Sequence, residues 1–412
     1  MKNKLVKILF IVIIAIVLCG CSDATEPDTL GYVVAIGVDK AEKEEAKFDI
    51  TLQFANPSKI SGGASQEGGK GGKDSIENIT VTAPGIYTAV NIANHIISKT
   101  FTLSHTKLIV FSEDVSKRGL EDLLETIGRS SDIRPNTYFA VSKGKAKEFL
   151  EAVNPETEVN PVRYYTMIFE NDYSGFIPQN LSQDFYFYAG SNEKSSVLPM
   201  CAVSKQKGTD NFSDTGYQYK LEDYSAGDVP TDKKETEVMG MAIFDHDKMV
   251  GEMGDIETEI FNILSGEYKS SYVSYFYSKT PEDPITVLQQ QNKMPKIEVD
   301  TNSDTPKIKI KLFLEADFNS STPEVAVEDY LNEFSNEVIE EIKNQVYNFL
   351  DKTIQIGTDI VGFGSYAKRN FPDVKIFSDY NWEEKYKSSQ FDVNVEFVIR
   401  RTGLVVRSEK DR

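Results

Sequence analysis

The first 21 residues constrain this chain more than any other stretch, because they decide where the rest of it folds. Lys2, Lys4 and Lys7 precede an uninterrupted apolar run, Ile8–Leu18, which is 11 residues long. As a helix this run would rise about 16 Å, roughly half of the ~30 Å hydrocarbon core of a bilayer. It is therefore too short for a permanent membrane span. A basic start followed by such a run is typical of a signal peptide.

The signal ends in Leu18-Cys19-Gly20-Cys21, and small residues before a cysteine are typical of lipoprotein processing. We predict that cleavage removes residues 1–20, that the Cys21 thiol takes a diacylglyceryl thioether, and that residues 21–29 form a lipidated tether. Two acyl chains hold a protein at a membrane more durably than one, since each buried methylene contributes about 0.8 kcal/mol. The alternative, an uncleaved anchor, is disfavoured because charged sequence resumes at Asp23. The mature chain is then expected to lie outside the cytoplasm.

The charge of the chain argues against several kinds of partner. The full chain has a formal net charge of −19, and loss of the three signal lysines leaves −22 on 392 residues. Nucleic acids and anionic membrane surfaces attract basic faces, so neither is an expected partner of so acidic a chain. We interpret the acidic surface as a solvated one, with cation binding as the less favoured alternative.

Cysteine usage limits how the mature protein is stabilised. Of the three cysteines, Cys19 is removed with the signal and Cys21 is acylated, which leaves Cys201. An intrachain disulfide is then impossible, so hydrophobic cores must stabilise the protein. No apolar run of 18 or more residues follows the signal, and no second membrane span is predicted.

Residues 30–154 are expected to form an N-terminal α/β domain. Apolar runs and alternation predict strands at 30–38, 47–55, 106–111 and 138–141. Apolar spacings of three and four predict helices at 84–97, 120–127 and 142–149, the last capped by Ser142. The first two strands are predicted to form a hairpin, and the whole order predicts one mixed sheet covered on one face. The Gly-rich Ser61–Lys73 lacks the G-x-x-x-x-G-K spacing of a phosphate-binding loop and is interpreted as a disordered surface loop.

Residues 155–290 are expected to form a middle α/β domain. Its predicted elements are a strand, a hairpin and a helix ended by Gly266, at 197–203, 238–250 and 256–264. The polar residues 206–236 are predicted to be a long excursion between strands. A domain boundary is placed near Pro281–Gln291.

Residues 291–412 are expected to form a C-terminal α/β domain. Alternation predicts strands at 308–318 and 391–399, each with one face on a core. Between them Thr322-Pro323 is predicted to start a long helix whose apolar stripe is Val327, Leu331, Phe334, Val338, Ile342, Val346 and Phe349. This helix is expected to lie across an antiparallel sheet. The predicted fold class is α+β: three mixed α/β domains in a row, each a largely antiparallel or mixed sheet with helices packed on one face.

A search for catalytic or metal-binding patterns finds none that is specific. His95, His105 and His246 lack H-E-x-x-H or C-x-x-C spacing, so structural roles are favoured over zinc ligation. Ser104 and His105 are not expected to act as nucleophile and base, because neighbouring residues in an extended segment point to opposite faces. The chain also has no G-x-S-x-G elbow.

The acidic residues give equally weak signals. Glu257 and Glu259 are two residues apart on a predicted helix, so their side chains diverge and are not expected to pair as acid and base. The Asp245-His246-Asp247 segment could bind a cation, but a turn-forming role is favoured. Asp39, which follows the first strand, is also interpreted as a turn residue. We therefore predict no catalytic residue, no metal and no cofactor.

Short motifs spread through the mature chain carry a family signal. The first is Cys21 followed by the strand that ends Ile36-Gly37-Val38-Asp39. The others are Pro84-Gly85, Leu103–Val110, Ile133-Arg134-Pro135, Gly240–Phe244, Met249-Val250-Gly251, Glu257-Thr258, Asp359–Gly364, Trp382 and Val398–Gly403. In this order behind a lipobox they resemble the Ger(x)C family of spore-germination lipoproteins, the C subunits of nutrient germinant receptors.

The resemblance implies a non-enzymatic receptor subunit that is required for the germination response and acts by protein–protein contact. Its implied partners are an integral-membrane A subunit and a transporter-like B subunit. Its implied place is the inner spore membrane, held on the outer, extracytoplasmic leaflet by the lipid on Cys21. Whether this subunit itself touches the nutrient stays open. A patch near Asp359–Tyr366 is the expected contact surface, because Gly362 and Gly364 allow close backbone approach.

Two other classes of protein fit the sequence less well. The alternative function is a substrate-binding lipoprotein of an importer, but this predicts two doubly wound lobes and the chain has antiparallel hairpins. A lipid-anchored cell-wall hydrolase would need a catalytic set, which the motifs do not supply.

Overall fold

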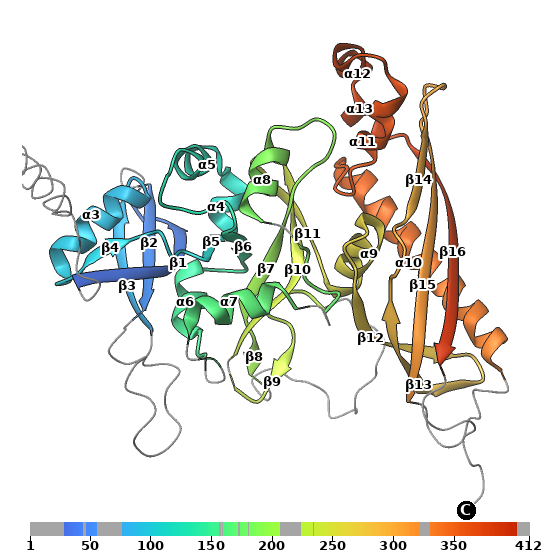
Figure 1. Cartoon of the computed structure of the whole chain (residues 1–412), viewed down its shortest axis with the longest axis horizontal. Helices are drawn as coiled ribbons and strands as arrows, with labels where there is room; N and C mark the ends of the chain where they lie inside the picture. Colours follow the sequence, from blue (N-terminus) through green and yellow to red (C-terminus); the bar gives the residue numbers. More distant parts are fainter. Residues whose placement is uncertain are drawn as a thin grey trace, which may run out of the picture.

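The computed structural model describes residues 29–401 except 44–46, 56–75, 156–157, 159, 172–173, 180, 207–223, 234 and 321–329. Within these residues two large sheets and their helices form an elongated molecule, with the first sheet towards the left of Figure 1 and the second at the right. Both sheets combine antiparallel with parallel pairs, and helices are interspersed with strands along the chain. The predicted α+β fold class is therefore confirmed.

The first sheet starts as an antiparallel meander and continues through parallel strands. β1 (Leu30–Lys40), β2 (Phe48–Ala55) and β3 (Ile76–Ala83) form the meander, which includes the predicted hairpin. The other strands lie beyond β1: β4 (Thr100–Thr102), β5 (Leu108–Ser112), β6 (Tyr138–Ser142), β7 (Val197–Val203), β10 (Thr236–Asp245) and β11 (Lys248–Met253). The last two form the predicted second hairpin.

Helices cover both faces of this sheet, whereas the sequence predicted cover on one face. All five residues of β5 are buried, because alternate side chains enter two separate cores. Ile109 and Phe111 join the first core, and Leu108 and Val110 join the second. The first core is closed by α3 (Ile86–Ile96), α4 (Glu113–Arg118), α5 (Glu121–Gly128) and α8 (Ser182–Ala189), the second by α6 (Ala146–Ala152) and α7 (Pro161–Phe169).

The sequence pattern does not predict α4, α7 or α8. Each is six to nine residues long, which gives at most about two turns of periodic signal. α7 is nevertheless well marked locally: Pro161 occupies its first turn, and the Asn160 side chain accepts hydrogen bonds from Val162 N and Arg163 N.

The predicted cap of α6 is wrong. Ser142 is the last residue of β6, and the helix begins at Ala146 after Lys145. The capping acceptor is Asp39 at the end of β1, whose carboxylate oxygens accept from Ala146 N at 2.8 Å and from Lys147 N at 2.9 Å. Burial raises the pKa of Asp39, and these two bonds partly offset that effect. Asp39 is thus a helix cap supplied by a distant strand rather than a turn residue.

The second sheet carries the long helix that the sequence predicts. Its strands are β12 (Ser270–Tyr277), β13 (Thr280–Gln290), β14 (Lys296–Asp300), β15 (Lys307–Ser320) and β16 (Gln390–Arg401). The pairs are antiparallel except that β15 and β16 run parallel, so the sheet is mixed. α10 (Leu331–Ile356) buries most of the predicted stripe, namely Phe334, Val338, Ile342, Val346 and Phe349. The predicted start at Thr322-Pro323 lies outside the described residues.

Strand pairing crosses the domain boundaries drawn from the sequence. β7, β10 and β11 belong to residues 155–290 but extend the sheet of residues 30–154. β12 and β13 belong to the same range but pair within the second sheet. The segment 281–291 is not a linker, since β13 covers nearly all of it. The division into three domains stays a prediction about folding units.

Candidate functional site

A hydrophobic core joins the two sheets. Val197, Met241 and Met253 of the first sheet belong to the same buried cluster as Val287 and Leu312 of the second. α9 (Asp255–Ser265) lies at this junction, and Figure 1 shows it between the two sheets. It starts with the Glu257 carboxylate accepting from Gly254 N and ends at Gly266 as predicted, where φ is left-handed at 77°.

The two sheets with their helices form the two halves of the molecule. A buried carboxylate organises the segment of the second half that faces the first half. Asp359 Oδ1 accepts from Gly362 N at 2.8 Å and from Phe363 N at 3.0 Å. Its Oδ2 accepts from Gly364 N at 2.7 Å and from the indole Nε1–H of Trp382 at 2.9 Å. Burial raises the pKa of Asp359, and the four donors partly offset this. The result is a fixed turn that leads into α11 (Phe363–Ala367).

The chain between α8 and β7 lies directly against this turn. Ser195 N donates to the main-chain oxygen of Asp359 at 2.8 Å. Gly364 sits so close that an added Cβ would lie 2.4 Å from the carbonyl oxygen of Glu193. The carboxylate of Glu193 pairs with Lys368 just beyond α11. Residues 190–196 therefore form, with residues 359–364, a contact that only glycine permits.

Lys194 extends this contact towards α9. Its aliphatic chain lies against Gly362, where an added Cβ would be 2.9 Å away. Its ammonium lies 4.8 Å from the Tyr188 ring centre and 5.9 Å from that of Phe261. Burial raises the pKa of the Glu267 carboxyl, and the Lys194 charge opposes that rise. Lys194 thus links α8, α9 and residues 359–364, which we call the glycine turn.

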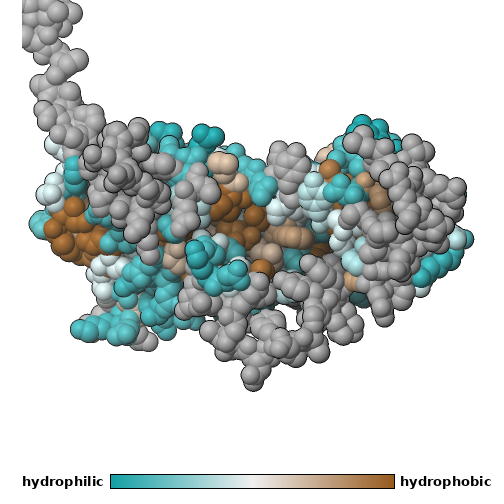
Figure 2. Space-filling model, turned by 90° about the horizontal axis from the view of Figure 1, so that it is seen from below, coloured by the Kyte–Doolittle hydropathy of each residue, from teal (hydrophilic) through white to brown (hydrophobic). Residues whose placement is uncertain are grey.

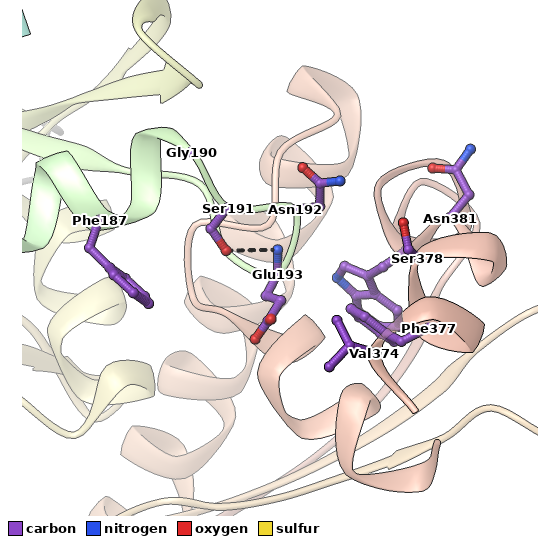
Figure 3. Close-up of a pocket in the computed structure, with 10 residues that line it drawn as sticks. Phe187, Gly190, Ser191, Asn192, Glu193, Val374, Phe377, Ser378 and Asn381 are labelled. Atoms are coloured by element: carbon purple, nitrogen blue, oxygen red, sulfur yellow. Dashed lines mark hydrogen bonds between the residues drawn. The ribbon is translucent and has the colours of Figure 1, made fainter. Parts of the chain in front are cut away.

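A pocket of about 340 Å³ opens beside this junction. Figure 3 shows residues 190–193 on one side of it and α12 (Val374–Tyr380) with α13 (Trp382–Tyr386) on the other. Its polar lining includes Ser191, Asn192, Ser378 and Asn381, and its apolar lining includes Phe187, Val374, Phe377 and the edge of Trp382. Ser191 Oγ accepts from Glu193 N at 3.1 Å, which shapes the loop.

The chemistry available in this pocket is hydrogen bonding and apolar contact. Glu193, its lining carboxylate, already pairs with Lys368. In the part of the chain that the structure describes, no three His, Cys, Asp or Glu side chains gather as a metal site would need. The pocket can therefore hold a small uncharged group or a side chain of a partner, but it offers no pair of free carboxylates for acid–base work.

Cys21, Ser61–Lys73 and residues 207–223 of the predicted excursion also lie outside the described residues. His95 is exposed on α3, with Nδ1 2.7 Å from Asn91 O. Within the residues that are described, no helix combines the length and the hydropathy needed to cross a bilayer.

Ser104 and His105 do contact each other, contrary to the prediction that their side chains diverge. Ser104 Oγ lies 3.0 Å from His105 Nδ1. The prediction assumed an extended chain, but these residues form a turn closed by Thr106 N donating to Leu103 O at 3.0 Å. Ser104 Oγ also contacts Thr102 Oγ1 at 3.0 Å, and the His105 ring packs edge-on against Tyr32. These contacts give the pair a role in fixing the turn.

The two glutamates of α9 diverge as predicted. Glu257 faces α10, where its carboxylate accepts from Lys352 Nζ at 2.7 Å. Glu259 faces the second sheet, where it is 8% exposed and accepts from Ser271 Oγ at 2.6 Å. Burial raises the pKa of Glu259, and the Ser271 hydroxyl partly offsets this. Nothing in the sequence pattern distinguishes this buried carboxyl from the exposed ones.

Asp245, His246 and Asp247 form the hairpin turn that was favoured over a cation site. Asp245 and Lys248 are opposite each other in the register of β10 and β11, and His246 has a positive φ of 53°. Asp247 accepts from Glu121 N at 3.2 Å and so positions the start of α5. His246 Nε2 lies 3.8 Å from a carboxylate oxygen of Glu383 in α13, which brings the hairpin tip to the second half.

The expected contact surface at Asp359–Tyr366 is wrong for most of its residues. Asp359, Ile360, Val361 and Phe363 are each at most 7% exposed. Gly362 and Gly364 do permit a close backbone approach, but the approaching residues are Lys194 and Glu193 of the same chain. The segment therefore holds the two halves of this protein together and presents little of itself to a partner.

The fold and the junction together define a class of protein. It is a mixed α/β protein built on two sheets, in which the glycine turn of the second half packs against the loop after α8 in the first half. The sequence matches two family domains described as the spore germination protein N-terminal domain, at residues 23–203, and the spore germination B3/GerAC like C-terminal domain, at residues 239–403. The chain belongs to the Ger(x)C family of spore germination proteins, as the sequence resemblance indicated.

Relatives with assigned names match along most of the chain. Spore germination protein KC of Bacillus subtilis strain 168 is 24% identical over 98% of this chain and 97% of its own length. Spore germination protein GerQC of Bacillus cereus is 21% identical over 73% of this chain and 76% of its own. The crystal structure of the GerBC protein has a TM-score of 0.53 and 16% identity, covering 89% of this chain and 98% of its own, and it shares the fold.

Proposed function

We propose that this protein is the lipid-anchored C subunit of a nutrient germinant receptor. In this role Cys21 carries the anchor on the outer leaflet of the inner spore membrane. The folded body contacts an integral-membrane A subunit and a B subunit, without catalysing a reaction. The germination response to the receptor's nutrient requires the subunit.

The observation that carries this proposal is the match of both family domains along residues 23–203 and 239–403, in one chain and in order. The relative from Bacillus subtilis named spore germination protein KC spans 98% of this chain. Such coverage favours the same role for the whole body rather than a shared module. It also favours this role over the importer lipoprotein, the alternative that the sequence left open.

The contacts at the junction support action through binding rather than through catalysis. The carboxylates at this junction serve structure: Asp359 of the turn accepts from four donors, and Glu193 of the facing loop pairs with Lys368. A body locked in this way can couple two binding events by favouring one arrangement of its partners. Typical couplings of about 1–3 kcal/mol change an affinity roughly 5- to 150-fold.

The anchor is tested by metabolic labelling with a clickable fatty acid. Wild type is expected to incorporate the label and to sediment with membranes, whereas Cys21→Ala is expected to lose both properties. Cys201→Ala is the matched control, because that thiol is fully buried and should not affect acylation. Equal labelling of wild type and Cys21→Ala would exclude the anchor.

The receptor role is tested by capturing the tagged protein from detergent-solubilised spore membranes and identifying what comes with it. We expect integral-membrane A and B subunits, and we expect deletion of the protein to abolish germination in response to one class of nutrient only. Recovery of importer components would replace the proposal with the alternative. Recovery of no membrane protein, together with normal germination after deletion, would also contradict it.

A further inference from the structure

An uncharged stretch lies on the surface of this acidic protein. Residues 78–98 contain no Asp, Glu, Lys or Arg, although these four make up 26% of the chain. The stretch runs from within β3 through α3, and its next charged residue is Lys99. A solvated helix of so acidic a protein would ordinarily carry charges on its outer face.

The outer face of α3 is apolar in part. Ile86, Ala89 and Ala93 point into the first core and are fully buried. Beside this buried stripe, Ile92 is 37% exposed and Ile96 is 65% exposed, four residues apart and so on one face. Figure 2 shows hydrophobic residues gathered at the left end of the molecule, which α3, β3 and β4 form in Figure 1. We call Ile92 and Ile96, with the exposed uncharged residues around them on α3, the α3 face.

The α3 face lies near the point where the tether joins the folded body. Leu30, the first residue of β1, pairs with Thr100 of β4. Ile96 is four residues before Thr100, so their Cα atoms lie within about 14 Å of each other. Eight residue steps separate Cys21 from Thr29, and even a fully extended chain of this length spans no more than about 29 Å. Lipid on Cys21 would therefore keep this end of the molecule close to the bilayer.

We propose that the α3 face rests on the lipid bilayer to which Cys21 is attached, with Ile92 and Ile96 at the boundary between headgroups and acyl chains. The proposal rests on the anchor at Cys21. The mature chain, with a net charge of −22 once the three signal lysines are lost, is repelled by anionic headgroups over most of its surface, and α3 is an element without a carboxylate to oppose the approach. Two aliphatic side chains at i and i+4 add apolar contact where the tether already supplies proximity. The contact fixes how the body stands on the membrane.

The test places an environment-sensitive nitrobenzoxadiazole probe on the full-length lipidated protein in phosphatidylcholine vesicles. Ile96→Cys carries the probe at the α3 face. Met294→Cys is the matched control, because Met294 is also 65% exposed but lies between β13 and β14 in the second half. The remaining thiol of the acylated protein, Cys201, is fully buried and is not expected to react.

We expect the probe at residue 96 to emit at shorter wavelength on vesicles than in detergent-free buffer and to be quenched by lipid brominated near the headgroup. The probe at residue 294 should show neither change. If the protein floats with the vesicles and the probe at residue 96 stays aqueous, the α3 contact is excluded while the anchor stands. If the protein does not float, the anchor fails and the proposal fails with it. A shift seen in spore membranes but absent from protein-free vesicles would assign the α3 face to a protein partner and overturn the lipid assignment.

Discussion

Asp359 shows how a buried carboxylate is accommodated by hydrogen bonds. It is 6% exposed, and its two carboxylate oxygens accept four hydrogen bonds, three from main-chain N–H groups and one from Trp382. Burying an ionised carboxylate is costly unless its oxygens are paired in this way. The donors come from both sides of the turn, so the carboxylate holds residues 362–364 and α13 in one arrangement.

Replacing Asp359 with Asn should weaken this arrangement. One acceptor oxygen becomes an N–H donor that faces N–H groups, and leaving such groups unsatisfied costs about 1–3 kcal/mol of unfolding free energy. Urea unfolding at constant m-value measures the loss. Asp351→Asn, at an exposed position of α10, is the control and should change little. Equal stability of the two variants would show that the carboxylate does not organise the turn.

Glu259 is a buried carboxyl whose protonation should couple to stability. Burial raises its pKa above the ordinary value of 4.5, so the folded state favours the protonated form. Its contribution to stability is therefore fully present below pH 4.5 and is lost as the pH rises through the raised folded value. Tyr268 and Ser271 lie in the same buried network, at 2.7 Å from each other.

We expect Glu259→Gln to gain stability relative to wild type as the pH rises from 4.5 towards neutrality, because the variant has no charge to bury. The unfolding free energies of both proteins, measured in urea at several pH values, give the difference directly. Glu340→Gln is the control, since that side chain is 67% exposed. A difference between wild type and Glu259→Gln that does not vary with pH would contradict the assignment.

At the scale of elements, the loop after α8 and the turn before α11 fit because two glycines leave room. Gly362 has a positive φ of 89°, which glycine adopts without strain, and Gly364 lies under Glu193 and Trp382. Gly190, at the end of α8, has no atom within 4 Å of an added Cβ. The loop after α8 thus has room for a side chain at Gly190, whereas Gly364, which it contacts through Glu193, has none.

Gly364→Ala should separate these two elements. Its Cβ would lie 2.4 Å from Glu193 O and 2.7 Å from the Trp382 ring, so one of them must move, at a cost of about 1–3 kcal/mol. Trp382 emission should shift to longer wavelength as water reaches the ring, and the unfolding midpoint should fall. Gly190→Ala should change neither quantity. Unchanged emission in Gly364→Ala would mean that the contact is looser than described.

For the whole molecule, the shared core and the glycine turn predict one cooperative unit. The sequence contains a single tryptophan, Trp382, which is 2% exposed and lies at the junction. Its fluorescence therefore reports on the contact between the halves, whereas far-ultraviolet circular dichroism reports on both sheets and all helices. We expect the two signals to give coincident urea transitions. An earlier fluorescence transition would show that the halves separate before either unfolds.

Local patterns in the sequence were sufficient to predict the elements whose signal lies within one segment. Alternation with a period of two marked β15 and β16, and spacings of three and four marked α10, because side-chain direction in a strand or helix follows from the backbone repeat. The end of α9 was predicted from Gly266, which is also a local signal. Family motifs supplied the family, but they did not say what their residues contact.

How these elements pack against one another depends on contacts between distant parts of the chain. Asp39 caps a helix that begins 107 residues later, and the first sheet takes strands from both sides of residue 154. Asp359 was readable as part of a motif, yet its role depends on Trp382, 23 residues further along the chain, and on a loop from the other half. Such contacts depend on which surfaces bury one another, and no periodicity within a single segment records that choice.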